Sequence, residues 1–274
     1  MTMSRPTLAL VFAVSSALVA GTLHHPPPVH ASGYACATNH CYGIVDWPGA
    51  TTGESTQIYV ASLSPGDGFV TNETWFNGDP GPGSACPLDG NPVAGCWVEA
   101  GVTVGQVDKT YCATDCYYWA DERPCSNGCQ SNYNEHFLGY PPAGDIGQRT
   151  TFQIVVDPPC GPCGWTGDCP GNEFGVTVTG ASGAVFSGLS YANGMIPSSI
   201  DVGMELYGTN GASASGSVYT YNQYRDNAGV YHYQANDGQI FPVNAPVQAR
   251  WEYPPSSNQV PGGAWSTSCP AGGC

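Results

Sequence analysis

The stretch "WVEAGVTV", residues 97–104, alternates apolar and other side chains at every position. Successive side chains of a β-strand point to opposite faces of the sheet. One face of this stretch is therefore uniformly apolar and consists of Val98, Ala100, Val102 and Val104. The other face carries Trp97, Glu99 and Gly101 in order. The stretch predicts a β-strand with a core face of valines and a carboxylate on the opposite face.

Similar β-branched and aromatic runs recur along the chain and are separated by many of the 37 Gly and 24 Pro residues. They cover residues 56–63, 96–104, 115–122, 150–157, 173–180, 199–208, 216–226, 229–236 and 246–254. None of them sustains a helical stripe over three turns, and Asn227-Ala228-Gly229 is typical of a hairpin turn. The pattern predicts an all-β fold, an antiparallel β-sandwich of the jelly-roll or concanavalin-like type with disulfide-rich loops.

The N-terminal segment has the features of a secretory signal peptide. Arg5 precedes an apolar run from Leu8 to Leu23, and Val29-His30-Ala31 offers a cleavage site of small residues. We therefore expect a signal peptide at residues 1–31 and a single secreted β-sandwich domain at residues 32–274. No later run is long enough to cross a bilayer, so we expect an extracellular protein that does not bind a membrane after cleavage.

The chain is strongly acidic, with 21 Asp and Glu against six Lys and Arg. Such a charge balance repels phosphate backbones, which argues against nucleic-acid binding. Protonation of the carboxyls at low pH would reduce the self-repulsion and would suit an acidic environment. We expect a monomer that acts on a protein or peptide substrate without cofactor or metal.

All thirteen cysteines follow the predicted signal peptide, so an exported chain of this kind is expected to form disulfides with one cysteine left over. The local pairs that the spacing suggests are Cys36/Cys41, Cys86/Cys96, Cys112/Cys116, Cys125/Cys129, Cys269/Cys274 and two of Cys160, Cys163 and Cys169. The "CGPC" motif at residues 160–163 imitates a redox site, but its Pro-Gly surroundings favour structural disulfides. Asn72-Glu73-Thr74 fits a glycosylation sequon.

A second stretch, "SIDVGMELYG" at residues 199–208, repeats the unusual polar face in reverse order. Its core face consists of Ile200, Val202, Met204 and Leu206. Its other face carries Gly203, Glu205 and Tyr207, so that glycine, carboxylate and aromatic mirror the order around Glu99. We hypothesise that the two strands are antiparallel neighbours. In that register Glu99 faces Glu205, Trp97 faces Tyr207 and Gly101 faces Gly203.

Two carboxylates so close to each other are destabilising in a purely structural sheet. Carboxyls that share a site commonly keep one proton between them, so that one acts as general base and the other donates a proton. Glu99 and Glu205 are therefore candidates for acid-range hydrolysis by activated water. Each of them also has an ordinary interpretation as a solvent-facing strand residue.

The order of motifs resembles that of the glutamic peptidases. "WVEAGVTV" is followed by "YYWADERP" at residues 117–124 and by "PPAGDIGQRTTFQIVVD" at residues 141–157. Eqolisins have a W/L-x-Q-A-G-V strand, a W-Y-E-W-x-P strand and a GD turn in this order. By this resemblance, Glu99 stands where eqolisins have the catalytic Gln, and Glu205 in "GMELYG" stands where they have the Glu.

A pair of glutamates is instead the arrangement of the related neprosin-type peptidases, which are secreted β-sandwich enzymes. The resemblance covers residues 95–210 and implies a secreted, acid-acting endopeptidase. Two features of the sequence differ from the pattern of these families. The eqolisin motif "A-E-W-I-x-E" is absent around Glu205, and no neprosin-type propeptide is expected after the signal peptide. Without a Gln, the division into a base and a neutral oxyanion donor requires one glutamate to stay protonated.

The expected substrate-binding residues are Trp97, Tyr118, Trp119, Tyr207, Gly101 and Gly203, with the aromatics as walls and the glycines as open space. Aromatic residues are equally typical of sandwich cores. Two other functions remain open at this stage. One is a carbohydrate-binding or glycan-hydrolysing sandwich, in which paired carboxylates cleave glycosidic bonds. The other is a non-catalytic surface module that is cross-linked by disulfides.

Overall fold

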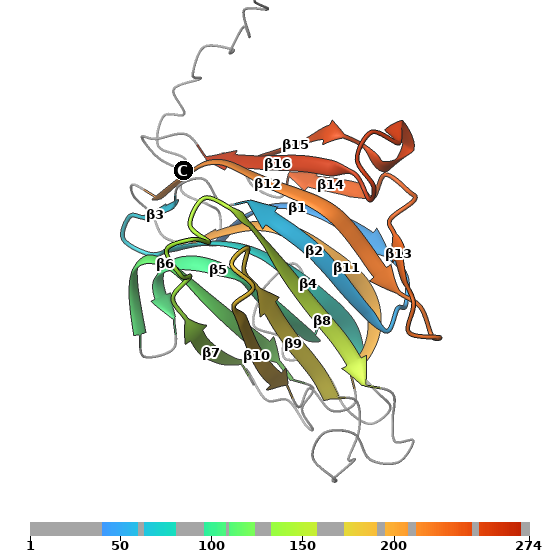
Figure 1. Ribbon diagram of the computed structural model, residues 1–274, viewed down its shortest axis with the longest axis horizontal. Coiled ribbons are helices and arrows are strands. Elements are labelled where there is room, and N and C mark those ends of the chain that lie inside the picture. Colours follow the sequence, from blue (N-terminus) through green and yellow to red (C-terminus); the bar gives the residue numbers. More distant parts are fainter. Residues whose placement is uncertain are drawn as a thin grey trace, which may run out of the picture.

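The computed structural model describes residues 40–59, 63–80, 96–107, 110–123, 133–157, 173–190, 195–207, 212–242 and 247–269. The predicted signal peptide and the "CGPC" motif lie outside the described residues. Two antiparallel sheets lie one over the other (Figure 1). This arrangement confirms the all-β antiparallel sandwich. Within the described residues, no helix is long and apolar enough to cross a membrane.

Sheet A has the strand order β14-β1-β11-β4-β5-β6-β7. Its strands are β1 (His40–Pro48), β4 (Phe69–Pro80), β5 (Cys96–Val107), β6 (Thr110–Glu122), β7 (Tyr133–Gly139), β11 (Met195–Tyr207) and β14 (Gln239–Pro242). The strands that carry Glu99 and Glu205 are thus both in sheet A, with β4 between them.

Sheet B has the order β10-β9-β8-β2-β12-β16-β15, and the short strands β3 and β13 also pair with β12. Its strands are β2 (Gly53–Tyr59), β3 (Leu63–Pro65), β8 (Arg149–Asp157), β9 (Glu173–Thr179), β10 (Val185–Ser190), β12 (Ala212–Arg225), β13 (Tyr231–Tyr233), β15 (Gln248–Tyr253) and β16 (Ala264–Cys269). One turn of 3₁₀ helix, η1 (Pro255–Ser257), precedes β16.

The core fills the space between the sheets, as the alternation predicts. Val98, Ala100 and Val102 of β5 belong to one buried cluster with Phe152 and Ile154 of β8. Their removal from water supplies the main stabilisation, about 25 cal/mol for each Å² of apolar surface. The opposite face of β5 is left to carry the polar side chains of sheet A.

Each of the nine predicted runs overlaps a strand, although only Tyr231–Tyr233 of the run at residues 229–236 is extended. The hairpin turn is also confirmed. Gly229 has a φ of 83°, and the backbone N–H of Asp226 donates a hydrogen bond across the turn to the carbonyl oxygen of Val230. Sequence reasoning did not predict β1, β4, β7, β10, β14 and β16. Of these, β4 matters most for function, since it separates the two glutamate strands.

The disulfide predicted between Cys112 and Cys116 is present, with Cα atoms 6.0 Å apart. Cys41, Cys96 and Cys269 are also disulfide-bonded, while the partners predicted for them lie outside the described residues. The sequon at Asn72 is not accessible for glycosylation in this fold. Asn72 is fully buried between the sheets, where its side-chain oxygen accepts a hydrogen bond of 2.5 Å from the Tyr219 hydroxyl.

Candidate active site

The hypothesised pairing of the two glutamate strands is wrong. Strand β4 separates them, so Glu99 lies opposite Trp75 and Glu205 lies opposite Thr71. The residue opposite both Gly101 and Gly203 is Glu73 of β4. The error arises because alternation fixes the face of a side chain but contains no information about the neighbouring strand.

The carboxylates nevertheless converge. One side-chain oxygen from each of Glu73, Glu99 and Glu205 lies within 4.8 Å of the others. The three residues follow a diagonal across β5, β4 and β11, with Glu73 in the middle. All three are buried, with 0%, 5% and 8% of the residue exposed, respectively. Three adjacent buried carboxyls cannot all ionise without a large free-energy cost, so the cluster must hold protons or a cation.

The two glycines permit this convergence by letting neighbouring strands approach closely. A Cβ atom at Gly101 would lie 2.6 Å from the Cβ of Glu73, and one at Gly203 would lie 2.3 Å from the Gly43 carbonyl oxygen. Both distances are far below van der Waals contact. Gly101 and Gly203 therefore flank Glu73 and make room for the longer side chains, rather than facing each other.

Glu205 is surrounded by hydrogen-bond donors from β1. His40 Nδ1 contacts its Oε1 atom, and the hydroxyl of Tyr42 donates a hydrogen bond to its carboxylate. Tyr42 lies directly opposite Glu205 in the sheet. Burial, followed by the negative charge of Glu205, raises the pKa of Tyr42 far above its usual range, so this hydroxyl keeps its proton. Glu205 thus has two polar side chains of β1 in contact with its carboxyl group.

Glu99 has the opposite environment. Burial raises the pKa of its carboxyl well above the usual range, and the negative charges of Glu205 and Glu135 raise it further. The indole of Trp75, directly opposite, donates to the carboxyl and counteracts this increase in part. The Trp97 indole also faces the carboxyl, but its N–H lies outside hydrogen-bonding geometry. Protonated Glu99 is therefore the favoured form.

Glu73 is the functional candidate that sequence reasoning missed. The hydroxyl of Thr71 donates to its Oε1 atom at 2.6 Å, whereas its buried Oε2 atom has no hydrogen-bond partner. Burial raises the pKa of Glu73 well above its usual range, and Glu99 and then Glu205 add to the effect. A signal was present in the sequence, because Glu73 and Trp75 repeat the carboxylate-plus-aromatic face of the other two strands.

A second carboxyl pair lies on the same face of sheet A. Asp201 of β11 is directly opposite Asp46 of β1, and Asn77 donates to Asp201 Oδ2 at 2.7 Å. Burial, followed by the neighbouring Asp46, raises the pKa of Asp201 well above its usual range. The face is therefore acidic beyond the three glutamates and favours protonated carboxyls.

The expected substrate-binding residues fall into two groups. Trp97, Tyr118 and Tyr207 lie on the same face as Glu99, at alternate positions of β5, β6 and β11. Tyr207 is 38% exposed, whereas Tyr118 is only 1% exposed and packs with Ala120 and Phe137. Tyr118 is therefore covered by its neighbours in this structure.

Trp119 requires a correction, because it points to the other side of the sheet. It is opposite Ala100, belongs to the main core and stacks on His136 with ring centroids 4.1 Å apart. A side chain in this position does not line the face that carries Glu99. Neighbouring aromatics of a strand necessarily lie on opposite faces, so Tyr118 and Trp119 could not both be walls of one site.

The oxygens of Glu73, Glu99 and Glu205 are close enough together to suit a hard cation such as Ca²⁺. The groups that contact these carboxyls are instead hydrogen-bond donors from Thr71, Tyr42 and Trp75. Donors of this kind stabilise oxygens that carry a negative charge and leave fewer lone pairs for a metal.

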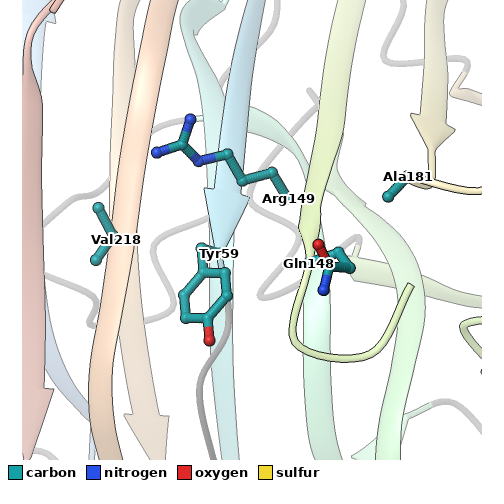
Figure 2. A pocket seen from close by; sticks show the side chains of 5 residues that line it. All are labelled: Tyr59, Gln148, Arg149, Ala181 and Val218. Atoms are coloured by element: carbon teal, nitrogen blue, oxygen red, sulfur yellow. The ribbon is translucent and has the colours of Figure 1, made fainter. Parts of the chain in front are cut away.

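A shallow hollow elsewhere in the molecule is lined by Tyr59, Gln148, Arg149, Ala181 and Val218 (Figure 2). It lies on sheet B, where Tyr59 is opposite both Arg149 and Val218. None of the expected catalytic residues lines it. The carboxyl cluster of sheet A, rather than this hollow, has the groups needed for acid–base chemistry.

Comparison with solved structures places the fold. The crystal structure of scytalido-glutamic peptidase with a peptide-based transition state analog matches with a TM-score of 0.50 and 12% identity, over 85% of this chain and 98% of that chain. A second scytalido-glutamic peptidase structure, with a transition state analog inhibitor, has a TM-score of 0.47, 13% identity and coverage of 83% and 97%. SCP-B, an eqolisin in complex with a tripeptide, has a TM-score of 0.45, 12% identity and coverage of 85% and 98%.

No protein-family model matches the chain, and no curated protein matches it by sequence. The likeness to the first structure therefore concerns the fold. It shows that the chain has a β-sandwich of the kind found in scytalido-glutamic peptidase, and the sandwich carries a buried carboxyl cluster on one sheet.

Proposed function

We propose that this protein is a secreted, acid-acting endopeptidase in which Glu99 and Glu205 hydrolyse peptide bonds through an activated water. The observation that carries the proposal is the contrast between two converging carboxyls. Glu205 is in contact with the polar side chains of His40 and Tyr42, whereas burial and neighbouring negative charge raise the pKa of Glu99 and favour its protonated form. The proposed base and the proposed acid are thus of the same residue type and belong to one carboxyl cluster.

The environments assign a role to each glutamate. Glu205 accepts a proton from a water molecule, whose oxygen then attacks the carbonyl carbon of the scissile bond. Protonated Glu99 donates a hydrogen bond to the oxyanion that develops on the carbonyl oxygen. The proton held by Glu205 passes to the leaving nitrogen when the tetrahedral intermediate collapses, which restores the starting state. Glu99 in its neutral form then serves as the donor that the resemblance to eqolisins assigns to Gln.

Several features support action at acidic pH. Burial raises the pKa of Glu54, Glu73, Glu99 and Asp201, so these groups are more readily kept neutral in acid. The Glu99 role in particular requires a proton, which is lost as the pH rises. Secretion is supported by the signal-like residues 1–31, and the similar structure of scytalido-glutamic peptidase holds a peptide-based analog.

The test is an assay of the purified protein on casein at pH 3–5, beside a panel of polysaccharides at the same pH. We expect cleavage of casein that is lost in Glu205→Gln and retained in Glu252→Gln. Glu252 is a suitable control because it lies on β15 of sheet B and pairs with Arg250 at 2.8 Å. Cleavage of a polysaccharide but not of casein would refute the peptidase and favour a glycoside hydrolase with the same pair. If the protein bound a polysaccharide but cleaved neither polysaccharide nor casein, the result would favour the non-catalytic surface module.

A further inference from the structure

His40 joins the carboxyl cluster from the first residue of β1. Its Nδ1 atom contacts Oε1 of Glu205, although its Cα partner in the sheet is Tyr207. The side chains of His40 and Glu205 are 38% and 11% exposed, so the contact is partly shielded from water. Charge pairs at such positions are screened less than those on an open surface.

We propose that His40 is a positioning residue for Glu205, which it holds ionised and oriented as the general base in acidic solution. The inference rests on the proposed peptidase function and adds to it a residue outside the glutamate pair. An acid-acting enzyme with a carboxylate base must keep that carboxylate ionised while most others take up protons. An imidazolium in contact with the carboxylate opposes its protonation.

The aromatic residues around His40 restrict the position of its ring. The ring centroid lies 4.6 Å from that of Tyr207, 6.0 Å from that of Phe69 and 6.3 Å from that of Tyr42. Tyr207 and Phe69 stack on each other with centroids 5.4 Å apart. Tyr207, which the sequence predicts as a wall for substrate, thus also forms a wall for His40.

The side chains packed against His40 are a carboxyl group, two phenols and one apolar ring. Glu205 and Tyr207 of β11 face it, as does Tyr42 on its own strand, while β4 contributes the apolar Phe69. The carboxyls of Glu73 and Glu99 belong to the same cluster as that of Glu205, with one oxygen of each within 4.8 Å of the others. An ordinary histidine is protonated below about pH 6.5, so in acidic solution His40 carries a positive charge beside these groups.

In the described part of the chain, several other basic residues have contacts away from Glu205. Arg123 pairs with Asp121, His232 pairs with Asp226 and Arg250 pairs with Glu252. His136 stacks on the core residue Trp119. Of the ion pairs between described residues, the one formed by His40 is therefore the one that involves the proposed catalytic pair.

The first arm of the test compares pH–rate profiles of the wild type, His40→Gln and His40→Lys on casein. We expect kcat of His40→Gln to fall in the acidic limb, which moves to higher pH by about one unit, while KM changes little. His40→Lys should restore the limb, because it restores a positive charge. His232→Gln is the matched control, since it removes a similar His–carboxylate pair from β13 of sheet B and should leave the profile unchanged.

The second arm does not depend on activity. The imidazole of His40 is followed by NMR as a function of pH in the wild type and in Glu205→Gln, and we expect its titration midpoint to be lower in the variant. An active wild type with the same acidic limb in His40→Gln would overturn the inference and leave the peptidase proposal intact. Unchanged His40 titration in Glu205→Gln would also overturn it. A folded wild type that cleaves no peptide would refute the peptidase proposal and, with it, the role of His40.

Discussion

Glu99 and Glu205 lie on strands that do not pair with each other, yet their side-chain oxygens approach within 4.8 Å. Strand β4 lies between them and places Glu73 at the centre of the diagonal. The two outer carboxyls meet different groups: His40 and Tyr42 of β1 contact Glu205, whereas Glu99 faces the indole of Trp75 and the negative charges of Glu205 and Glu135. This asymmetry makes the two glutamates distinguishable by mutation.

Glu99→Gln is expected to retain activity and to keep it at higher pH than the wild type. Glutamine has nearly the shape of a protonated glutamic acid and remains a neutral donor when the pH rises. Glu99→Leu lacks the donor and should reduce kcat by about 10²–10³-fold. The measurement is kcat/KM between pH 3 and 8. If Glu99→Gln were as inactive as Glu205→Gln, Glu99 would have to be ionised in the active form.

The protein should be more stable in acid than at neutral pH. Glu54, Glu73, Glu99 and Asp201 have a pKa above that of the unfolded chain, since burial penalises their charged forms. Stabilisation from such groups is fully present below their unfolded pKa, about 4, and is lost as the pH rises through the folded pKa. Urea unfolding should therefore give a larger free energy of unfolding at pH 4 than at pH 8.

Replacement of Glu73 should reduce this dependence on pH. Glu73→Gln keeps the shape of the side chain but cannot ionise, so at pH 8 we expect it to be more stable than the wild type, because it avoids the cost of a buried negative charge. At pH 4 the two proteins should differ little. Glu252→Gln, at a more exposed position, serves as the control. Equal pH dependence in Glu73→Gln and the wild type would show that Glu73 does not titrate in the folded protein over this range.

Gly101→Ala should destabilise the protein by about 1–3 kcal/mol, the usual cost of overpacking. The new methyl group would lie 2.6 Å from both the Asn72 carbonyl oxygen and the Glu73 Cβ atom. Gly175→Ala in β9 is the matched control, because its methyl group would meet only the Val155 carbonyl oxygen at 3.9 Å. Thermal unfolding of both variants checks the prediction. A Gly101→Ala variant as stable as Gly175→Ala would contradict the close approach of β4 and β5.

Trp119 and Trp97 should respond differently to truncation. Trp119→Ala removes a core side chain and is expected to cost about 3–5 kcal/mol of folding free energy. Trp97 is partly exposed on the face of Glu99, so Trp97→Ala should cost less stability and mainly raise KM for a peptide. Denaturant unfolding together with steady-state kinetics separates the two effects. A raised KM in Trp119→Ala with unchanged stability would contradict its core position.

The fold class and the face on which each candidate side chain lies follow from the sequence alone. The alternation in residues 97–104 and 199–206 places valines and other apolar residues in the core and places Glu99, Gly101, Gly203 and Glu205 on the opposite face, as found. These inferences succeed because the period of two is a local property of an extended backbone. The same property shows that Tyr118 and Trp119 cannot share a face.

The choice of neighbouring strands and the groups around each carboxyl depend on how the whole chain packs. Strand β4 comes between β5 and β11, and the N-terminal β1 brings His40 and Tyr42 to Glu205 from 163 or more positions away in the sequence. Neighbouring strands are selected by packing of the whole chain, and the protonation of a carboxyl depends on burial and on charges from every adjacent strand. A pair of glutamates could therefore be predicted from the sequence, but the difference between them comes from the fold.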